Sequence, residues 1–165
     1  MNFKNTWLVG LVSAALIAAT TRWEGTRYVP YQDVADVWTV CDGYAGKDVI
    51  RNKTYTPAEC TALLTTQLKS KGEEVLKCTN VPLNQNQFNA FTLFTYNVGG
   101  EAFCRSSLLK KLNAGDYAGA CNGLLAWDRA DGKVVAGLLA RRKFERDWCL
   151  RPIVAEAAEA AEVTQ

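Results

Sequence analysis

The chain has 165 residues, of which 48% are hydrophobic, and its 19 basic and 17 acidic side chains leave a net charge of +2. This length corresponds to about one domain with a sizeable hydrophobic core. The small net charge, without a basic stripe interleaved with aromatic residues, argues against nucleic-acid binding. The sequence contains no histidine, which excludes Ser-His and Cys-His nucleophiles and removes the commonest zinc ligand. We therefore expect no metal and no cofactor.

The N-terminal segment has the pattern of an exported protein. Lys4 is followed by an uncharged run at residues 6–21 that is rich in Ala, Leu and Val. A positive start and an apolar run predict export, with the N-terminus staying in the cytoplasm. As a helix, this run would reach only about 24 Å, less than a hydrocarbon core of roughly 30 Å. The segment would therefore enter a membrane but be held there weakly.

Two interpretations of this segment stay open. Small side chains at residues 15–19 would permit cleavage of a signal peptide. Cleavage there would leave Glu24 close to a new terminus, where the chain frays, although a catalytic acid needs a rigid support. Only residues from about 15 to 24 are available to build a helix that ends at Glu24. We favour an uncleaved segment, residues 1–21, that overlaps this helix.

Two carboxylates and a hydroxyl follow in a spacing that suits glycosidic chemistry. Glu24 precedes Gly25 and is expected at a helix end, whereas Asp33 follows Pro30 on extended chain or in a turn. Cleaving a glycosidic bond takes one protonated carboxyl that donates to the leaving oxygen and a second, ionised group. Thr39 offers a hydroxyl that could hold a water. The spacing alone is a weak signal, because such pairs are more often solvated surface residues.

Hydrophobic periodicity predicts an α+β fold that is mostly α. Residues 32–54 combine short apolar runs with turn formers such as Asp42-Gly43, which predicts a small antiparallel hairpin sheet. Thr56-Pro57-Ala58-Glu59 has the form of a capping box and begins a helix of about twenty residues. The remainder is predicted to be helical. Asn84 would cap the first of these helices, and a short helix would run from Ser106 or Ser107 to Gly115. A third helix would run from Asp116 through Trp127 and, after a turn at 128–133, a last helix would begin at about Val134.

Six cysteines, none in a CxxC pair, suit an exported protein better than a metal site. The even number allows three disulfides in several possible connectivities. The alternative is a set of small buried thiols in a reducing compartment. We favour sequential pairing on the basis of loop length and of where the helices are expected: Cys41 with Cys60, Cys78 with Cys104, and Cys121 with Cys149.

Longer motifs resemble one family. Glu24, Asp33 and Thr39 at these intervals, with the run Trp38-Thr-Val-Cys-Asp-Gly43, are similar to the phage-type lysozymes, or endolysins, of glycoside hydrolase family twenty-four. The resemblance implies a lysozyme-like two-lobed domain with a small hairpin sheet, a long linking helix and a helical C-terminal lobe. It continues in order over residues 22–150, through Phe94-Thr-Tyr-Asn-Val-Gly99, Ser107-Leu-Leu-Lys-Lys-Leu-Asn-Ala-Gly-Asp-Tyr117, Trp127, and Gly137-Leu-Leu-Ala-Arg-Arg142 with Glu145.

The resemblance also implies roles for single residues. Glu24 would act as the acid, Asp33 as its catalytic partner and Thr39 as the residue that positions water. Asn97 lies where the family places an amide near the acid, and an amide can bond a sugar hydroxyl as well as a carboxyl group. An ordinary helix cap is the alternative for Asn97.

Tyr31 and the arginine pair Arg141 and Arg142 have two interpretations each. Tyr31 would stack on a sugar ring or pack under the sheet. Arg142, or its neighbour Arg141, would support Glu24 or belong to a salt-bridged helix face, and a cation lowers a carboxyl pKa that an acid catalyst needs raised. Tyr44 stands where many relatives have a histidine. This departure from the family pattern concerns only the side chains that support Thr39, because the two carboxylates Glu24 and Asp33 are unchanged.

The expected protein is therefore a monomeric muramidase that hydrolyses, with inversion, the bond between N-acetylmuramic acid and N-acetylglucosamine in peptidoglycan. It resembles the signal-anchor-release endolysins, which implies an inner-membrane anchor at residues 1–21, a lysozyme domain at 22–150 and an Ala/Glu tail at 151–165. The protein would be exported, tethered to the membrane and then soluble in the periplasm. The alternatives are a lytic transglycosylase, which needs only one carboxyl, and a non-catalytic, membrane-anchored wall-binding protein.

Overall fold

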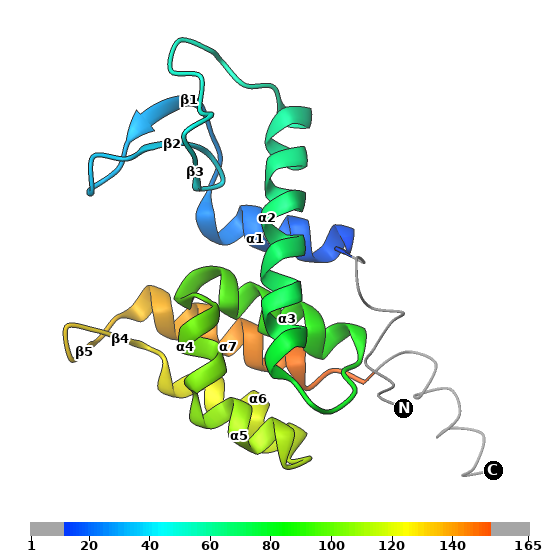
Figure 1. The fold of residues 1–165 in the computed structure, drawn as a ribbon. Coiled ribbons are helices and arrows are strands. Elements are labelled where there is room, and N and C mark those ends of the chain that lie inside the picture. The colour runs from blue at the N-terminus through cyan, green and yellow to red at the C-terminus, as the bar shows by residue number, and fades with distance from the viewer. Residues whose placement is uncertain (1–11, 153–165) are drawn as a thin grey trace. The chain divides into compact units, whose positions relative to one another are not determined.

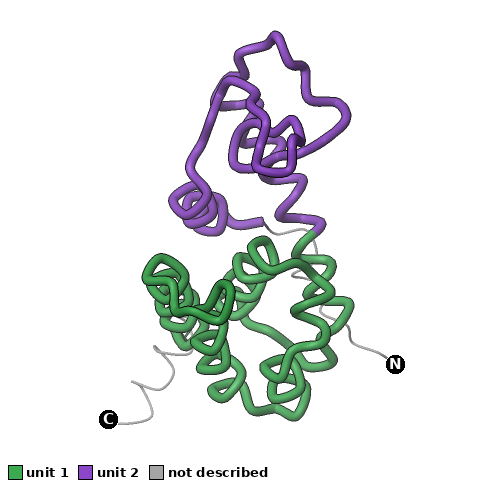
Figure 2. Tube along the Cα trace, turned by 90° about the vertical axis from the view of Figure 1, so that its left-hand side faces the viewer, with its two compact units in different colours: residues 1–10, 71–165 green, residues 11–70 purple. Residues whose placement is uncertain are grey.

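The structure is a computed structural model that describes residues 12–152. Within this range the chain forms mainly helices with two small antiparallel sheets (Figure 1), which confirms the expected fold class. It divides into two compact units (Figure 2), one of residues 12–70, called here the N-terminal unit, and one of residues 71–152, the C-terminal unit. The expectations for residues 1–11 and 153–165 lie outside the described range.

The first helix of the N-terminal unit, α1, runs from Ala14 to Glu24. Ser13 caps it, because its hydroxyl accepts a hydrogen bond of 3.1 Å from the N–H of Leu16. Gly25 ends the helix with φ 72°, a left-handed conformation that glycine adopts without a steric penalty. Its N–H donates to the carbonyl of Thr21 at 2.9 Å. The prediction that Glu24 is the last residue of a helix is confirmed.

Three strands follow in the order β1-β2-β3, with β1 at Arg27–Gln32, β2 at Trp38–Cys41 and β3 at Tyr44–Ala45. The prediction that the sheet begins at residue 32 was wrong, since β1 begins at Arg27 and includes Pro30. Proline is tolerated there because β1 is an edge strand with an irregularity in its pairing between Arg27 and Tyr31. In the regular part of the ladder, Tyr31 lies opposite Thr39.

A small hydrophobic core holds this sheet. Its buried members are Val40, Cys41, Val49, Tyr55 and Cys60, and the partly buried side chains of Trp38, Tyr44 and Leu63 pack against them. The Cys41–Cys60 disulfide crosses this core.

Helix α2 spans Pro57–Cys78 and belongs to the N-terminal unit up to residue 70. The predicted capping box is confirmed, because the N–H of Thr56 donates to the carboxylate of Glu59 at 2.9 Å and the N–H of Glu59 donates to the Thr56 hydroxyl at 3.2 Å. The Lys53 ammonium group also donates to the Glu59 carboxylate. These contacts lower the pKa of Glu59 to about 2, and the bond from Lys53 has the largest effect.

The C-terminal unit is built around α3, Gln85–Val98, which packs against α4, Gly100–Arg105, and α7, Ala136–Cys149. Asn84 and Gln87 form a capping box at the start of α3. The buried rings of Phe91 and Phe94 lie 5.8 Å and 6.5 Å, between ring centroids, from the ring of Phe103. Helices α5, Ser107–Asn113, and α6, Tyr117–Gly123, begin at the caps Ser106 and Asp116.

Two boundaries in this unit differ from the prediction. The helix from Asp116 ends at Gly123 and continues only as a 3-10 turn, η1, Leu124–Ala126. The segment expected to be a turn is a short hairpin of β4, Arg129–Ala130, and β5, Lys133–Val134. Helix α7 therefore begins two residues later than predicted, at Ala136.

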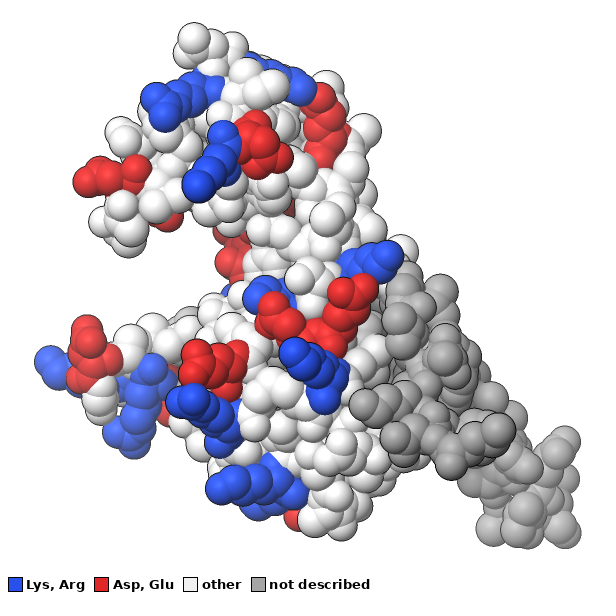
Figure 3. Space-filling model, in the orientation of Figure 1, with Lys and Arg blue, Asp and Glu red and all other residues white. Residues whose placement is uncertain are grey.

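The disulfides follow the sequential pairing that we favoured, and all six cysteines are used: Cys41–Cys60, Cys78–Cys104 and Cys121–Cys149. Basic and acidic side chains are interspersed over the face shown in Figure 3, as the small net charge implies. Between residues 12 and 152, no helix has the length and apolar character needed to cross a membrane.

Candidate active site

Glu24 and Asp33 come from different elements of the N-terminal unit. Glu24 is the exposed last residue of α1, and Asp33 is the first residue after β1. Thr39 lies in β2, which pairs with β1. The two carboxylates and the hydroxyl that the sequence singled out therefore belong to one compact unit.

The side chain of Asp33 is fixed by the turn between β1 and β2. Its Oδ1 accepts hydrogen bonds from the N–H groups of Ala35, at 2.8 Å, and of Val37, at 3.0 Å. The N–H of Asp33 in turn donates to the carbonyl of Val37 at 3.0 Å. The bonds from Val37 and then Ala35 lower the pKa of Asp33 below its ordinary value of 3.8, whereas burial acts in the opposite direction and the Thr39 hydroxyl lowers it further. Asp33 is thus held as a carboxylate in one orientation.

The second oxygen of Asp33 lies near Thr39. The Thr39 hydroxyl is 3.5 Å from Asp33 Oδ2 and 3.2 Å from the carbonyl oxygen of Val37. Thr39 is only 4% exposed, so its hydroxyl cannot rotate freely into solvent. A hydroxyl has one proton to donate and two lone pairs that accept. The proton of Thr39 is directed to Asp33 Oδ2 and the Val37 carbonyl, so the Thr39 oxygen and Asp33 Oδ2 together offer acceptors to a water beside them.

Tyr31 lies opposite Thr39 in the ladder, and directly paired residues project from the same face of a sheet. The Arg27 guanidinium carbon is 4.4 Å from the centroid of the Tyr31 ring, which is a cation–π contact. One side of this half-buried ring is therefore covered by Arg27. A role of Tyr31 in substrate binding stays a prediction.

Tyr44, the departure from the family pattern, has a local partner. Its hydroxyl donates to the carboxylate of Asp48, with oxygens at 2.9 Å and 3.0 Å. This hydrogen bond raises the pKa of Tyr44 above its ordinary value. On the β3 side of the sheet, Thr39 lies opposite Ala45, and Tyr44 lies opposite Val40. The Tyr44 side chain is thus engaged with the loop after β3.

Asn97 and Arg142 lie in the C-terminal unit and contact each other. The Arg142 guanidinium donates to the Asn97 side-chain oxygen at 3.0 Å and lies over the ring of Phe94 at 4.9 Å. Arg141 and Arg142 both pair with the buried carboxylate of Glu145, at 3.1 Å and 2.9 Å. Both arginines are therefore members of a salt-bridged helix face. The predicted roles of Asn97 and Arg142 in binding or support stay predictions.

Sequence reasoning missed Asp42, which it interpreted only as a turn former before Gly43. Asp42 is 3% exposed, and its Oδ1 accepts a hydrogen bond of 2.8 Å from the hydroxyl of Thr26. A buried acid is uncommon unless it is paired or hydrogen-bonded. No local signal in the sequence marked this contact, because it joins the residue before β1 to the residue after β2.

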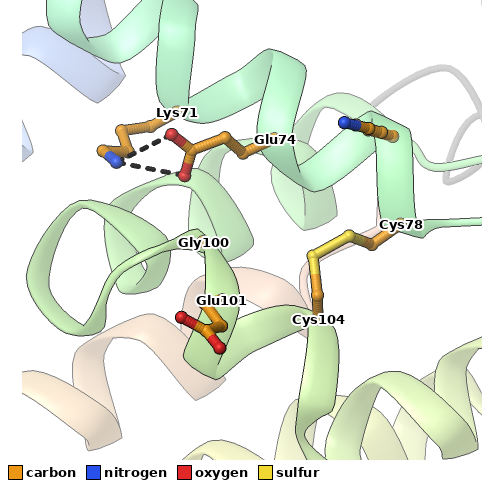
Figure 4. A pocket seen from close by; sticks show the side chains of 7 residues that line it. Lys71, Glu74, Cys78, Gly100, Glu101 and Cys104 are labelled. Atoms are coloured by element: carbon orange, nitrogen blue, oxygen red, sulfur yellow. Dashed lines mark hydrogen bonds and ion pairs between the residues drawn. A yellow bond between two sulfur atoms is a disulfide. The ribbon is translucent and has the colours of Figure 1, made fainter.

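A hollow of about 320 Å³ lies in the C-terminal unit, and no predicted site residue lines it (Figure 4). Lys71 and Glu74 on its wall pair with each other at 2.9 Å. Among residues 12–152, no three acidic or cysteine side chains gather as a metal-ligand set. The hollow is lined by Lys71, Glu74, Lys77, Cys78, Gly100, Glu101 and Cys104.

An acid at a helix end and an oriented carboxylate beside a hydroxyl, in a mostly helical chain with a small sheet, are the features that a hydrolase of the lysozyme class needs. The chain belongs to the phage lysozyme family, whose model matches residues 21–145. It is a muramidase of the endolysin type, and peptidoglycan is its substrate class.

Individual relatives agree with this assignment. The chain is 44% identical over 127 residues to a protein named SAR-endolysin of Enterobacteria phage PA-2, with 77% of each chain covered. It is 45% identical over 129 residues to the SAR-endolysin of Escherichia phage Mu, covering 78% of this chain and 75% of that one. A crystal structure of a P22 lysozyme mutant matches with a TM-score of 0.79 and 33% identity, covering 85% of this chain and 98% of that one.

Proposed function

We propose that this endolysin hydrolyses the β-1,4 bond between N-acetylmuramic acid and N-acetylglucosamine by direct attack of water, with inversion. Glu24 donates its proton to the leaving oxygen. Asp33 stays ionised on the other side of the sugar, and Thr39 helps it to hold the attacking water. This mechanism needs one protonated and one ionised carboxyl group.

The geometry of Asp33 supports this proposal most directly. Two backbone N–H groups hold Oδ1, so Oδ2 is the oxygen left to face the Thr39 hydroxyl at 3.5 Å. The same bonds lower the pKa of Asp33, which suits a group that must be negative when the oxocarbenium-like transition state forms. A buried hydroxyl beside this oxygen favours the binding of a water over direct covalent attack by Asp33.

The test of the acid assignment is Glu24→Gln in the full chain, assayed by loss of turbidity of permeabilised cells. Removing a general acid is expected to lower the rate by roughly 10²–10⁴-fold. Glu73→Gln is the matched control, because Glu73 is an exposed acid on α2 and should leave activity unchanged. Full activity of Glu24→Gln would remove the acid assignment.

The reaction type has separate readouts. NMR of the fresh product distinguishes inversion from retention, and a retained configuration would show that Asp33 attacks the sugar itself. Mass spectrometry of released muropeptides distinguishes hydrolysis from the anhydro product of a transglycosylase. A protein that sediments with cell wall but releases no reducing sugar would be a binding module.

We further infer that the N-terminal segment tethers the protein to the inner membrane before its release into the periplasm. Relatives of the chain are named SAR-endolysins, and the uncharged run at residues 6–21 overlaps α1. The helix that ends in Glu24 would then be completed only after release. N-terminal sequencing of the soluble, active form tests this, and a start near Thr20 would contradict it.

A further inference from the structure

The structure contains a buried carboxylate, Asp42, that the proposed reaction does not use. Asp42 follows Cys41 at the end of β2 and is 3% exposed. Its Oδ1 accepts a hydrogen bond of 2.8 Å from the hydroxyl of Thr26. A hydrogen bond to a carboxylate is shorter and stronger than one between neutral groups. Thr26 is therefore firmly attached to the end of β2.

Thr26 is the second residue after Glu24, and Gly25 is the only residue between them. Gly25 has φ 72°, and a Cβ built on it would meet no atom within 4 Å. The space beside its Cα is therefore open, and glycine is the residue with the greatest backbone freedom. The direction of the chain at the end of α1 is therefore set by its anchored neighbours. One anchor is the bond from the Gly25 N–H to the Thr21 carbonyl at 2.9 Å, and the other is Thr26.

Asp42 is itself attached to a fixed part of the sheet. Cys41, directly before it, lies opposite Arg27 in the ladder and forms a disulfide with Cys60. The bond between Asp42 and Thr26 thus connects the end of α1 to β2, the strand that carries Thr39.

We propose that Asp42 is a positioning residue that, through Thr26, sets the orientation of the Glu24 carboxyl relative to Asp33 and Thr39. The proposal rests on the proposed function of Glu24 as the acid. Asp42 does not touch the reacting atoms; it restricts the glycine link beside the acid. Misplacement of a catalytic group by about 1 Å can cost roughly 100-fold in rate, so the effect should appear in kcat.

The test is Thr26→Val in the purified full chain, which removes the hydroxyl at nearly constant volume. We expect kcat to fall by about 10- to 100-fold with KM nearly unchanged, since substrate contacts remain. Thr26→Ser keeps a hydroxyl and should restore most of the activity. Thr61→Val is the matched control, because the Thr61 hydroxyl donates to a carbonyl on α2, at 3.0 Å, and is exposed.

Three outcomes would overturn the proposal: a kcat of Thr26→Val within about twofold of the parent, an equal loss in Thr26→Ser, or a loss confined to KM. If Thr26→Val does not fold, the same comparison is made with Thr26→Ala and Asp42→Asn. The Glu24→Gln variant tests the proposed function separately from the positioning role of Asp42. An inactive Glu24→Gln with a fully active Thr26→Val would reject the positioning role alone, whereas an active Glu24→Gln would reject the proposed function.

Discussion

One set of hydrogen bonds both orients the Asp33 carboxylate and keeps it ionised. The N–H groups that fix Oδ1 are those that lower its pKa, so the carboxylate is stabilised and aimed by the same turn. An Asp at the start of a turn is a common local motif, in which the side chain bonds the backbone two residues ahead. Here that motif presents the second oxygen toward Thr39.

This arrangement predicts how stability depends on pH. A carboxyl group whose pKa is lower in the folded state adds stability above its ordinary pKa, and that stability is lost as the pH falls through the folded value. Asp33→Asn should therefore lower the urea midpoint at pH 7, and the difference from the parent should shrink below the ordinary value of 3.8. Urea unfolding followed by circular dichroism, at pH 7 and at a pH below 3.8, checks this. A difference that does not change with pH would show that the turn does not favour the ionised form.

The proposed catalytic residues could be named from the sequence, whereas the contact between Asp42 and Thr26 could not. Glu24, Asp33 and Thr39 could be singled out from their spacing and from a family resemblance. The burial of Asp42 could not, because it depends on the register that places Arg27 opposite Cys41. Register is set by the pairing of whole strands, so the identity of a single residue does not indicate which residue it will lie opposite.

Helices whose ends carry a local signal were predicted best. Thr56, Asn84, Ser106 and Asp116 all cap the helices that were assigned to them. Strand β1 was missed because Pro30 argues against a strand, and proline is compatible with it only at an edge. The hairpin of β4 and β5 was missed because its strands have two residues each, too few to show alternation.

The cap of α3 gives a prediction at the scale of the element. Asn84 accepts a hydrogen bond of 2.9 Å from the N–H of Gln87, and the Gln87 side chain accepts one of 3.0 Å from the N–H of Asn84. Asn84→Ala should cost about 1 kcal/mol of unfolding free energy, the usual cost of losing an N-cap. Urea unfolding at neutral pH measures it, with Asn52→Ala in an exposed loop as control. Equal stability of the two variants would show that α3 is held by packing alone.

The three disulfides have different importance for the whole molecule. Cys41–Cys60 lies in the N-terminal unit, whose hydrophobic core is small, whereas Cys121–Cys149 lies in the unit built on the aromatic core of α3. A disulfide that closes 19 residues adds about 3 kcal/mol in the chain-entropy model. A small core depends more on such a link. The N-terminal unit, which carries Glu24, Asp33 and Thr39, has this one disulfide, whereas the C-terminal unit has the other two.

We therefore expect the double variant Cys41→Ser/Cys60→Ser to lose activity on heating at a lower temperature than Cys121→Ser/Cys149→Ser. The midpoint of thermal inactivation, measured on both purified proteins, makes the comparison. Each variant is the control for the other, because each removes one bond between buried cysteines. An equal shift in both would mean that the two units lose their structure together.

Helix α1 is part of both the proposed release from the membrane and the proposed catalytic site, because it overlaps the uncharged run and ends at Glu24. Leu16, Ala19 and Thr20 are buried in the folded protein, whereas Ala15 and Ala18 are exposed. In a membrane, both kinds of residue would contribute to the apolar character of the segment. The exposed positions therefore allow membrane affinity to be changed without altering the buried face of α1. Ser13 is less suitable for this purpose, because it caps the helix.

We expect Ala15→Leu/Ala18→Leu to increase the membrane-bound fraction and delay lysis. A leucine at the centre of a membrane helix is favourable by about 0.5 kcal/mol, so two should shift the ratio of bound to released protein by roughly fivefold. Fractionation of cells into membrane and periplasm measures this ratio. Ala15→Ser/Ala18→Ser is the control of opposite sign and should release more protein. The purified leucine variant should keep normal activity, so that delayed lysis with an unchanged membrane fraction would count against the tether.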